Sequence, residues 1–290
     1  MDLPFYIAVG VSNGTLYALM ALGLVLLYKT QNFVPFVNGE FFTAGAFAAF
    51  SVYNIFAMPY WAALCVAVLC GAAIGYLCER AVIRPLANSH HLSLVMVTVG
   101  ASIFLQGLAR MKWGDDIYTL PPIAADFTVR FAGVPIAAQN LIIVAAAIVL
   151  VGALFLFFTY TTMGKQVRAV SQNLIGAQLI GINPNTVYRT TWIISGVLGA
   201  VAGMLAAPLT LLYPNMGSEV LIKGFAAAIL GGLTSIPGAL IGGLAIGISE
   251  MLIAGYISTV FIKISAFIII MIVLLIKPEG IFGSKAAGRV

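Results

Sequence analysis

Two glutamates, Glu40 and Glu250, lie among long apolar stretches and are the residues best able to do chemistry there. A carboxylate inside a membrane is costly, so we treat each as functional until another role is found. Glu40 follows Asn38 and Gly39 and begins an apolar run. It could line a substrate path or complement the positive end of a helix as a first-turn acid, and the sequence favours neither interpretation. For Glu250 the sequence favours a surface or interhelix hydrogen-bonding role.

Glu40 belongs to the first of two segments, residues 32–40 and 213–219, that interrupt the apolar pattern in the same way. Each contains Pro, Asn, Gly and Glu in that order, and each is followed by a run rich in small residues. We expect the two segments on opposite membrane faces, as in an inverted repeat with broken helices. The candidate substrate-pathway residues are Asn38, Gly39, Glu40, Pro214, Asn215 and Gly217.

The stretch 164–188 is a third candidate site, because it is long, basic and amphipathic. Its apolar residues recur at helical spacing, and Gly181, with a proline just beyond it, predicts the end of that helix. The helix could lie on anionic lipid headgroups or dock on a soluble partner. In a docking helix, basic residues would steer the partner and small residues would allow close approach. The candidate coupling residues are Lys165, Arg168, Gly176, Ala177 and Gly181.

Residue patterns typical of enzymes are missing from the sequence. It contains no G-x-x-x-x-G-K-[ST] phosphate-binding motif, no H-E-x-x-H and no visible Ser/His/Asp set. Its three cysteines, Cys65, Cys70 and Cys78, fall on one apolar stretch, where they are too far apart to bridge and do not converge on a metal. We therefore predict no catalytic residues, metal or cofactor. If ATP supplies energy, another subunit binds it.

The elements that must position these residues are predicted by hydropathy. The chain is 62% hydrophobic and 8% charged, whereas a soluble domain has about 25% charged residues. Apolar stretches of roughly 18 residues or more, long enough to cross a bilayer, recur throughout. They are residues 5–28, 41–78, 92–109, 131–164, 190–218, 224–249 and 251–276. We predict an all-α, polytopic transmembrane helical bundle with about eight to nine membrane segments and broken or re-entrant helices.

The distribution of charge predicts the topology. Basic residues gather in 79–91, in 164–189 and in the tail from Lys277, whereas the stretch 113–139 is acidic. Since Lys and Arg accumulate in cytoplasmic loops, we place the basic segments inside and the acidic stretch outside. This gives an external N-terminus and a cytoplasmic C-terminus. The net charge of +5 therefore reflects membrane topology rather than nucleic-acid binding.

Small residues between 224 and 247 form two G-x-x-x-G pairs, Gly238 with Gly242 and Gly243 with Gly247. Such faces let membrane helices approach closely. Tight helix packing is favoured over a translocation path lined by backbone.

A set of motifs runs along almost the whole chain in a specific order. They are Leu16 to Leu24, Asn32-Phe33 with Gly39 to Phe42, Glu79-Arg80 with Arg84 to Leu86, Gly164 to Ala169, Gln172-Asn173, Ala177 to Asn183, Pro214 to Gly217, Leu230 to Ala239 and Lys277 to Gly283. With this set the chain resembles the permeases of branched-chain amino acid ABC transporters. The likeness is to the high-affinity subunit that is often paired with a second, different permease.

The resemblance implies a single permease domain, residues 1–290, in the bacterial inner membrane, with a cytoplasmic coupling loop at 162–189. It also implies three kinds of partner: a second permease chain, two cytoplasmic ATPase subunits, and a periplasmic or surface-tethered binding protein that delivers amino acids. The stretch 164–183 corresponds to the loop that docks on an ATPase.

The function implied is ATP-driven import of branched-chain or other hydrophobic amino acids. The family commonly has histidine at the position of Asn38 and includes relatives that carry urea or amides. An ABC permease for urea or amides is therefore an alternative. A second alternative is an ion-coupled secondary transporter that uses Glu40 to carry a small polar or zwitterionic solute.

Overall fold

The computed structural model describes residues 3–86, 89–123, 127–131, 134–277 and 279–283. The helices are α1 (Leu3–Gln31), α2 (Asn38–Phe50), α3 (Tyr60–Leu77), α4 (His91–Trp113), α5 (Ala138–Tyr160), α6 (Thr162–Gln172), α7 (Leu174–Leu179), α8 (Pro184–Ala206), α9 (Met216–Gly231), α10 (Ile236–Tyr256) and α11 (Ile262–Ile276). Shorter π- and 3-10-helical turns are η1 (Ser51–Ile55), η2 (Cys78–Ile83), η3 (Arg84–Leu86) and η4 (Thr259–Phe261). An antiparallel hairpin pairs β1 (Thr128–Phe131) with β2 (Val134–Ala137).

Among the described residues, six helices are long and apolar enough to cross a membrane. They are Leu3–Gln31, Tyr60–Leu86, His91–Trp113, Ala138–Tyr160, Pro184–Ala206 and Ile236–Tyr256. The structure therefore confirms the predicted class, a polytopic helical bundle, but not the count of eight to nine segments. The helices α2, α9 and α11 are not among these six; α9 and α11 are too short for a full span.

The helices α2 and α9 are the broken helices of the bundle. They contain 13 and 16 residues, and α2 runs on directly into the five-residue π-turn η1. At about 1.5 Å per residue, α9 falls short of a hydrocarbon layer of about 30 Å. The turn that separates α9 from α10 contains Gly232, whose φ of +99° belongs to the left-handed region that glycine tolerates. The backbone amides of Ile281 and Phe282 donate to the carbonyl oxygens of Leu230 and Gly231 and so cover the end of α9.

Glycines permit the two most extensive helix pairings, α1 with α10 and α3 with α8. A Cβ on Gly14 would lie 2.8 Å from the backbone of Leu244 in α10, so the helices meet backbone to backbone. Gly243 and Gly247 face α1 in the same contact, as expected for tight packing. Gly71 of α3 meets Gly196 of α8 in the equivalent way. These two pairings are equivalent under the exchange of α1–α4 with α8–α11, as expected of an inverted repeat.

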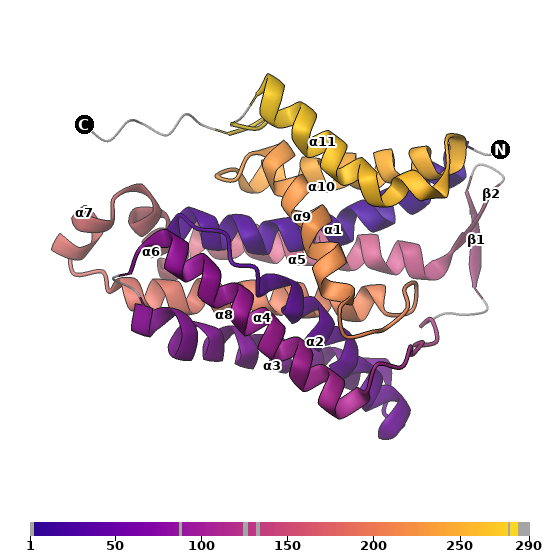
Figure 1. Ribbon diagram of the computed structural model, residues 1–290, viewed down its shortest axis with the longest axis horizontal. Helices are drawn as coiled ribbons and strands as arrows, with labels where there is room; N and C mark the ends of the chain where they lie inside the picture. Colours follow the sequence, from indigo (N-terminus) through magenta and orange to yellow (C-terminus); the bar gives the residue numbers. More distant parts are fainter. Residues whose placement is uncertain (1–2, 87–88, 124–126, 132–133, 278, 284–290) are drawn as a thin grey trace.

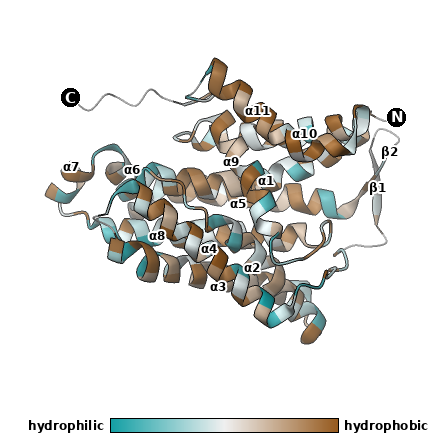
Figure 2. Ribbon diagram, in the orientation of Figure 1, coloured by the Kyte–Doolittle hydropathy of each residue, from teal (hydrophilic) through white to brown (hydrophobic). Residues whose placement is uncertain are grey.

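The helix α1 forms the centre of the bundle, with α5, α8, α9 and α10 packed against it (Figure 1). Of the residues in the apolar 18-residue stretch of α1, 78% are buried inside the bundle, whereas the corresponding share in α4 and in α5 is 17%. Figure 2 shows that central and outer helices are nevertheless both hydrophobic. An apolar outer surface is expected of helices that face lipid, where each helix satisfies its own backbone hydrogen bonds.

The two ends of the bundle differ in structure. The helices α6 and α7 lie at one end and the β1–β2 hairpin lies at the other (Figure 1). The basic stretches 79–91 and 164–189 share one cavity at the α6–α7 end. The acidic stretch 113–139 contains the hairpin and is joined to the α8–α9 loop by backbone pairing of Tyr118 with Leu212. Asp126, Lys285 and Arg289, which enter the predicted topology, lie outside the described residues.

One helix was expected across residues 164–180, but the structure divides it. Asn173 has an extended backbone, with φ of −150°, and separates α6 from α7. Its Oδ1 accepts a hydrogen bond from the Gly176 amide at 2.9 Å, so it is the N-cap of α7. The predicted stop at Gly181 agrees with its φ of +85° just after α7.

Candidate functional site

The amino-terminal ends of the half-helices α2 and α9 touch. A Cβ on Gly39 would lie 2.8 Å from the carbonyl oxygen of Gly217, and a Cβ on Gly217 would overlap the carbonyl of Gly39. The Gly217 amide also donates to Thr43 Oγ1 at 3.0 Å. We expected these two segments on opposite membrane faces. The structure corrects this, because both half-helices begin inside the bundle and meet there.

Glu40 is buried at this junction and is bound by side chains from two other helices. Its Oε1 accepts hydrogen bonds from Ser102 Oγ at 2.9 Å and Gln106 Nε2 at 2.8 Å, both from α4. Ser218 Oγ of α9 lies 3.5 Å from the same oxygen and 3.0 Å from Gln106 Nε2. These partners of Glu40 are all uncharged. We call Glu40, Ser102, Gln106 and Ser218 the Glu40 cluster.

Two partners of Glu40, Ser102 and Gln106, belong to a polar stripe on α4 that the sequence analysis missed. The stripe consists of Thr98, Ser102, Gln106 and Arg110. Residues four apart lie on one helix face, and this face is turned toward the broken helices. Thr98 Oγ1 accepts from the Phe36 amide at 3.2 Å, and Arg110 Nη2 donates to Asn215 Oδ1 at 3.2 Å. The repeat of a polar residue at every fourth position was the signal in an otherwise apolar span.

The other predicted pathway residues have different surroundings. Asn38 is fully buried and faces α8, where its Oδ1 accepts from Ser195 Oγ at 2.7 Å. Pro214 is buried in the loop before α9. The structure thus brings Gly39, Glu40 and Gly217 together and binds Asn215 to α4, whereas Asn38 faces α8 and Pro214 is buried in the preceding loop.

An apolar cavity of about 210 Å³ adjoins the Glu40 cluster. Ser102 and Ser218 contribute to both the cluster and the cavity wall. The remaining lining residues are apolar side chains of the α1–α2 turn, α4 and α9, namely Val34, Phe36, Val99, Ile103, Leu221, Ile222 and Phe225. A cavity with apolar walls and a few polar groups is the usual form of a small-molecule site.

The predicted coupling residues divide into exposed and buried ones. Lys165 and Arg168 are exposed on α6, and Gly176 is half-buried. Ala177, which we expected on a docking face, is only 3% exposed, because it packs with Val167 of α6 and attaches α7 to the bundle. Other apolar residues, on α7 and directly after it, are exposed. We call them the α7 patch: Ile175, Leu179 and Ile180, which are 70%, 83% and 75% exposed.

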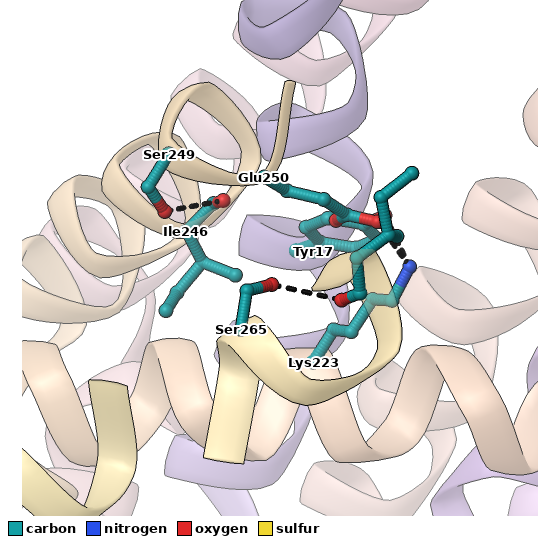
Figure 3. Close-up of polar contacts among 7 residues, drawn as sticks. Tyr17, Lys223, Ile246, Ser249, Glu250 and Ser265 are labelled. Carbon is teal, nitrogen blue, oxygen red and sulfur yellow. Dashed lines mark hydrogen bonds and ion pairs between the residues drawn. The ribbon is translucent and has the colours of Figure 1, made fainter. Parts of the chain in front are cut away.

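Glu250 has an interhelix role, as the sequence favoured. Its Oε1 lies 2.5 Å from Lys223 Nζ of α9, and Lys223 also donates to the Tyr17 hydroxyl of α1 at 3.1 Å. Figure 3 shows the three side chains converging from three helices. Nothing in the sequence pointed to Lys223 as the partner of Glu250.

Comparison with known proteins gives consistent results. A family described as the permease component of branched-chain amino acid transport systems matches residues 6–276. The high-affinity branched-chain amino acid permease LivH of Escherichia coli K12 is 32% identical, over 97% of this chain and 96% of the relative. A probable LivH permease of Methanocaldococcus jannaschii is also 32% identical, over 92% and 89%. In fold, the chain is similar to PsaBC from Streptococcus pneumoniae, with a TM-score of 0.50, 13% identity and coverage of 94% and 92%.

Proposed function

Because the chain belongs to the family of branched-chain amino acid transport permeases, we propose that it is the permease subunit of an ATP-driven importer of branched-chain or other hydrophobic amino acids. Its site is the junction of α2 and α9. The observation that carries the proposal is the apolar cavity bordered by the buried Glu40 cluster. An aliphatic side chain fits the apolar wall, and the polar head of an amino acid fits the hydroxyl, amide and carboxyl groups beside it.

The half-helices provide the path. Two helix ends that meet inside a membrane expose local charge and polar backbone at mid-depth, which is where transporters hold their substrates. Because Gly39 and Gly217 have no side chains, the backbones of α2 and α9 come into direct contact at this point. A displacement of α9 relative to α2 would widen the gap between the two helices and so open the path. The substrate-pathway residues of this proposal are Asn38, Gly39, Glu40, Pro214, Asn215 and Gly217, to which the polar stripe of α4 is added.

The orientation follows from charge. The basic end of the bundle, with α6 and α7, faces the cytoplasm, and the hairpin end faces outward. The chain then has an external N-terminus and a cytoplasmic C-terminus in the inner membrane, and forms one permease domain over residues 1–290.

The partners are a second, different permease chain, two cytoplasmic ATPase subunits and an external binding protein. The α7 patch supports the ATPase contact, because exposed apolar residues on a short helix at the basic end suit a groove on a soluble partner. Lys165 and Arg168 orient that contact, and Gly181 ends the coupling helix. The coupling loop comprises residues 162–189.

The decisive experiment is uptake by the reconstituted complex. Proteoliposomes that contain this chain, its partner permease, the ATPase subunits and the binding protein should import leucine, isoleucine and valine only when ATP is enclosed with the ATPase. Uptake driven by an ion gradient without ATP would instead favour a secondary transporter that uses Glu40. Uptake of urea or amides in preference to amino acids would mean that the chain is an ABC permease for a different class of substrate, with the same proposed path.

A further inference from the structure

The two basic stretches of the chain share a cavity of about 270 Å³ at the α6–α7 end of the bundle. Its wall is built from the last turn of α1, the turns η2 and η3, the starts of α4 and α8, the end of α6 and the first residue of α7. Polar and charged side chains in this wall include Lys29, Gln31, Glu79 and Arg84. We call it the basic cavity.

Glu79 supplies the only carboxylate among the described residues that line the basic cavity. The side chain is buried, with 3% of the residue exposed. Three arginines act on it electrostatically, namely Arg80, Arg84 and Arg189. Because three cations already surround this one carboxylate, Glu79 is not left over to neutralise a further cation of the cavity.

Lys29, on the opposite wall, lacks a partner of this kind. It forms no hydrogen bond or ion pair with a described residue, and the charge of Arg168 on α6 repels it. Two residues further on, the Nε2 amide of Gln31 is buried without a hydrogen-bond partner among the described residues. A buried N–H group without an acceptor is unfavourable. The wall of the basic cavity thus presents two donors, one of them charged, that need an acceptor.

The basic cavity lies where three membrane-spanning helices end. Gln31 is the last residue of α1, His91 is the first of α4, and Asn185 lies in the first turn of α8; all three residues line the cavity, and all three helices are long enough to span. The ends of such helices lie at the level of the lipid headgroups. Tyr188, also in the wall, is a residue type enriched at that level. The acceptor that a membrane supplies at this depth is the phosphate group of a phospholipid.

We propose that the basic cavity binds the phosphate of an anionic phospholipid, with Lys29 Nζ and Gln31 Nε2 as its donors. A phosphate carries negative charge and several acceptor oxygens, so one group satisfies both donors. Apolar parts of the wall, formed by Ile83, Leu94 and Leu174, suit the glycerol and the first carbons of the acyl chains. Basic pockets between membrane helices are typical sites for anionic headgroups.

A lipid in the basic cavity connects α6 to the bundle. Ser171 and Gln172 of α6 line one side of the cavity, and Lys29 of α1 lines another. A phosphate between them offsets the repulsion between Lys29 and Arg168, and so holds α6, the helix that precedes the α7 patch, against α1. The site is separate from the Glu40 cluster, and it does not depend on which solute the chain transports.

The test is the rate at which an amine-reactive acetylating reagent modifies Lys29, followed residue by residue by mass spectrometry. The purified complete transporter is stripped of lipid in non-ionic detergent and then given phosphatidylglycerol, phosphatidylcholine or glycerol phosphate. Phosphatidylglycerol should slow acetylation of Lys29 at least about fivefold, because bound phosphate covers the amine. The choline group of phosphatidylcholine offsets its phosphate charge, and glycerol phosphate has no acyl chains, so each should slow the reaction less than about twofold.

Lys277 is the internal control in the same samples. It is exposed, its Nζ donates to the Ile281 carbonyl oxygen, and it does not line the basic cavity. Its acetylation rate should be the same with and without phosphatidylglycerol. Equal slowing of both lysines, or no slowing at Lys29, overturns the proposal. Protection by glycerol phosphate as strong as that by phosphatidylglycerol means that a free phosphate ester occupies the site, and it overturns the lipid assignment.

The variant Gln31→Leu tests the second donor while leaving Lys29 as the reporter. We expect half-maximal protection of Lys29 to require at least about fivefold more phosphatidylglycerol, since one hydrogen bond to a charged group is lost. Gln178→Leu is the matched control, because it makes the same change at an exposed position outside the cavity. An unchanged titration in Gln31→Leu contradicts the role of Gln31. The rates in the unaltered transporter decide the proposal even if this variant does not fold, and neither measurement involves amino acid uptake, so failure here leaves the proposed function standing.

Discussion

At the scale of single residues, the predicted pathway residues occupy two different environments. Glu40 contacts α4 and α9 at the border of an apolar cavity, so its surroundings are those of a substrate site. Asn38, two residues earlier, faces α8 and is bonded to Ser195. Loss of the Asn38 side chain would leave the Ser195 hydroxyl without its buried partner, a cost of about 1–3 kcal/mol in stability.

We expect Glu40→Gln to reduce leucine uptake by about tenfold, equivalent to about 1.4 kcal/mol, while assembly is retained. Glutamine fills the same space and can still accept from Ser102, but it lacks the negative charge. The measurement is initial uptake by proteoliposomes, with complex yield as the assembly check. Asn38→Ala is the comparison, and it should lower the melting temperature more than Glu40→Gln does. Normal uptake by Glu40→Gln would remove this carboxylate from the path.

The contact of Gly39 with Gly217 gives a second prediction. Gly217→Ala places a methyl group on the Gly39 carbonyl, so the half-helices must separate or the complex must fail to form. We expect a loss of at least about 2 kcal/mol in stability from this overpacking. Gly100→Ala on α4 is the matched control, because a Cβ there meets nothing within 4 Å. Thermal unfolding of the two purified variants tests this, and equal melting temperatures would contradict it.

At the scale of elements, the segment that contains α6 and α7 is an anchored helix followed by a short exposed one. Ala177 packs with Val167 and holds α7 to the bundle, so a large residue there would damage the permease itself. The α7 patch faces away from the bundle and can be altered without that consequence. Coupling to a moving ATPase requires a physical contact that persists through its cycle, and in the proposed function the α7 patch provides that contact.

We expect Leu179→Glu to weaken co-purification of the ATPase subunits and to reduce substrate-stimulated ATP hydrolysis at least about tenfold, since it places a charge in an apolar contact that carries about 1.4 kcal/mol or more. Gln178→Glu is the control, because it adds the same charge at the neighbouring exposed position outside the patch. If Leu179→Glu retains full assembly and stimulation, α7 lies on lipid headgroups rather than on a partner.

At the scale of the whole molecule, the pairings α1 with α10 and α3 with α8 arrange two similar halves around the central contact of α2 with α9. Each half contributes one broken helix and one glycine to that contact. In the proposed function, this contact is the narrow part of the path, and the six longer helices of the described residues keep the bundle in the membrane.

Topology provides the prediction at this scale. Single cysteines are introduced at Asp115, whose side chain is 79% exposed, and at exposed Gln178, in a background without Cys65, Cys70 and Cys78. With the permease expressed alone in cells, a membrane-impermeant maleimide should label position 115 in intact cells and position 178 only after lysis. Labelling of both positions from the same side would mean that the predicted topology is wrong.

The sequence by itself determined the class of the protein, the two interruptions at 32–40 and 213–219, and the stop at Gly181, because hydropathy, proline and glycine act locally along the chain. Tertiary structure decided which residues meet. Glu40 finds Ser102 and Gln106 on α4, Lys223 finds Glu250 on α10, and Ala177 turns inward. The physical reason is that lipid and protein interior are both apolar, so composition cannot tell a buried face of α1 from a lipid-facing one of α4. Only the rotation and pairing of the helices make that distinction.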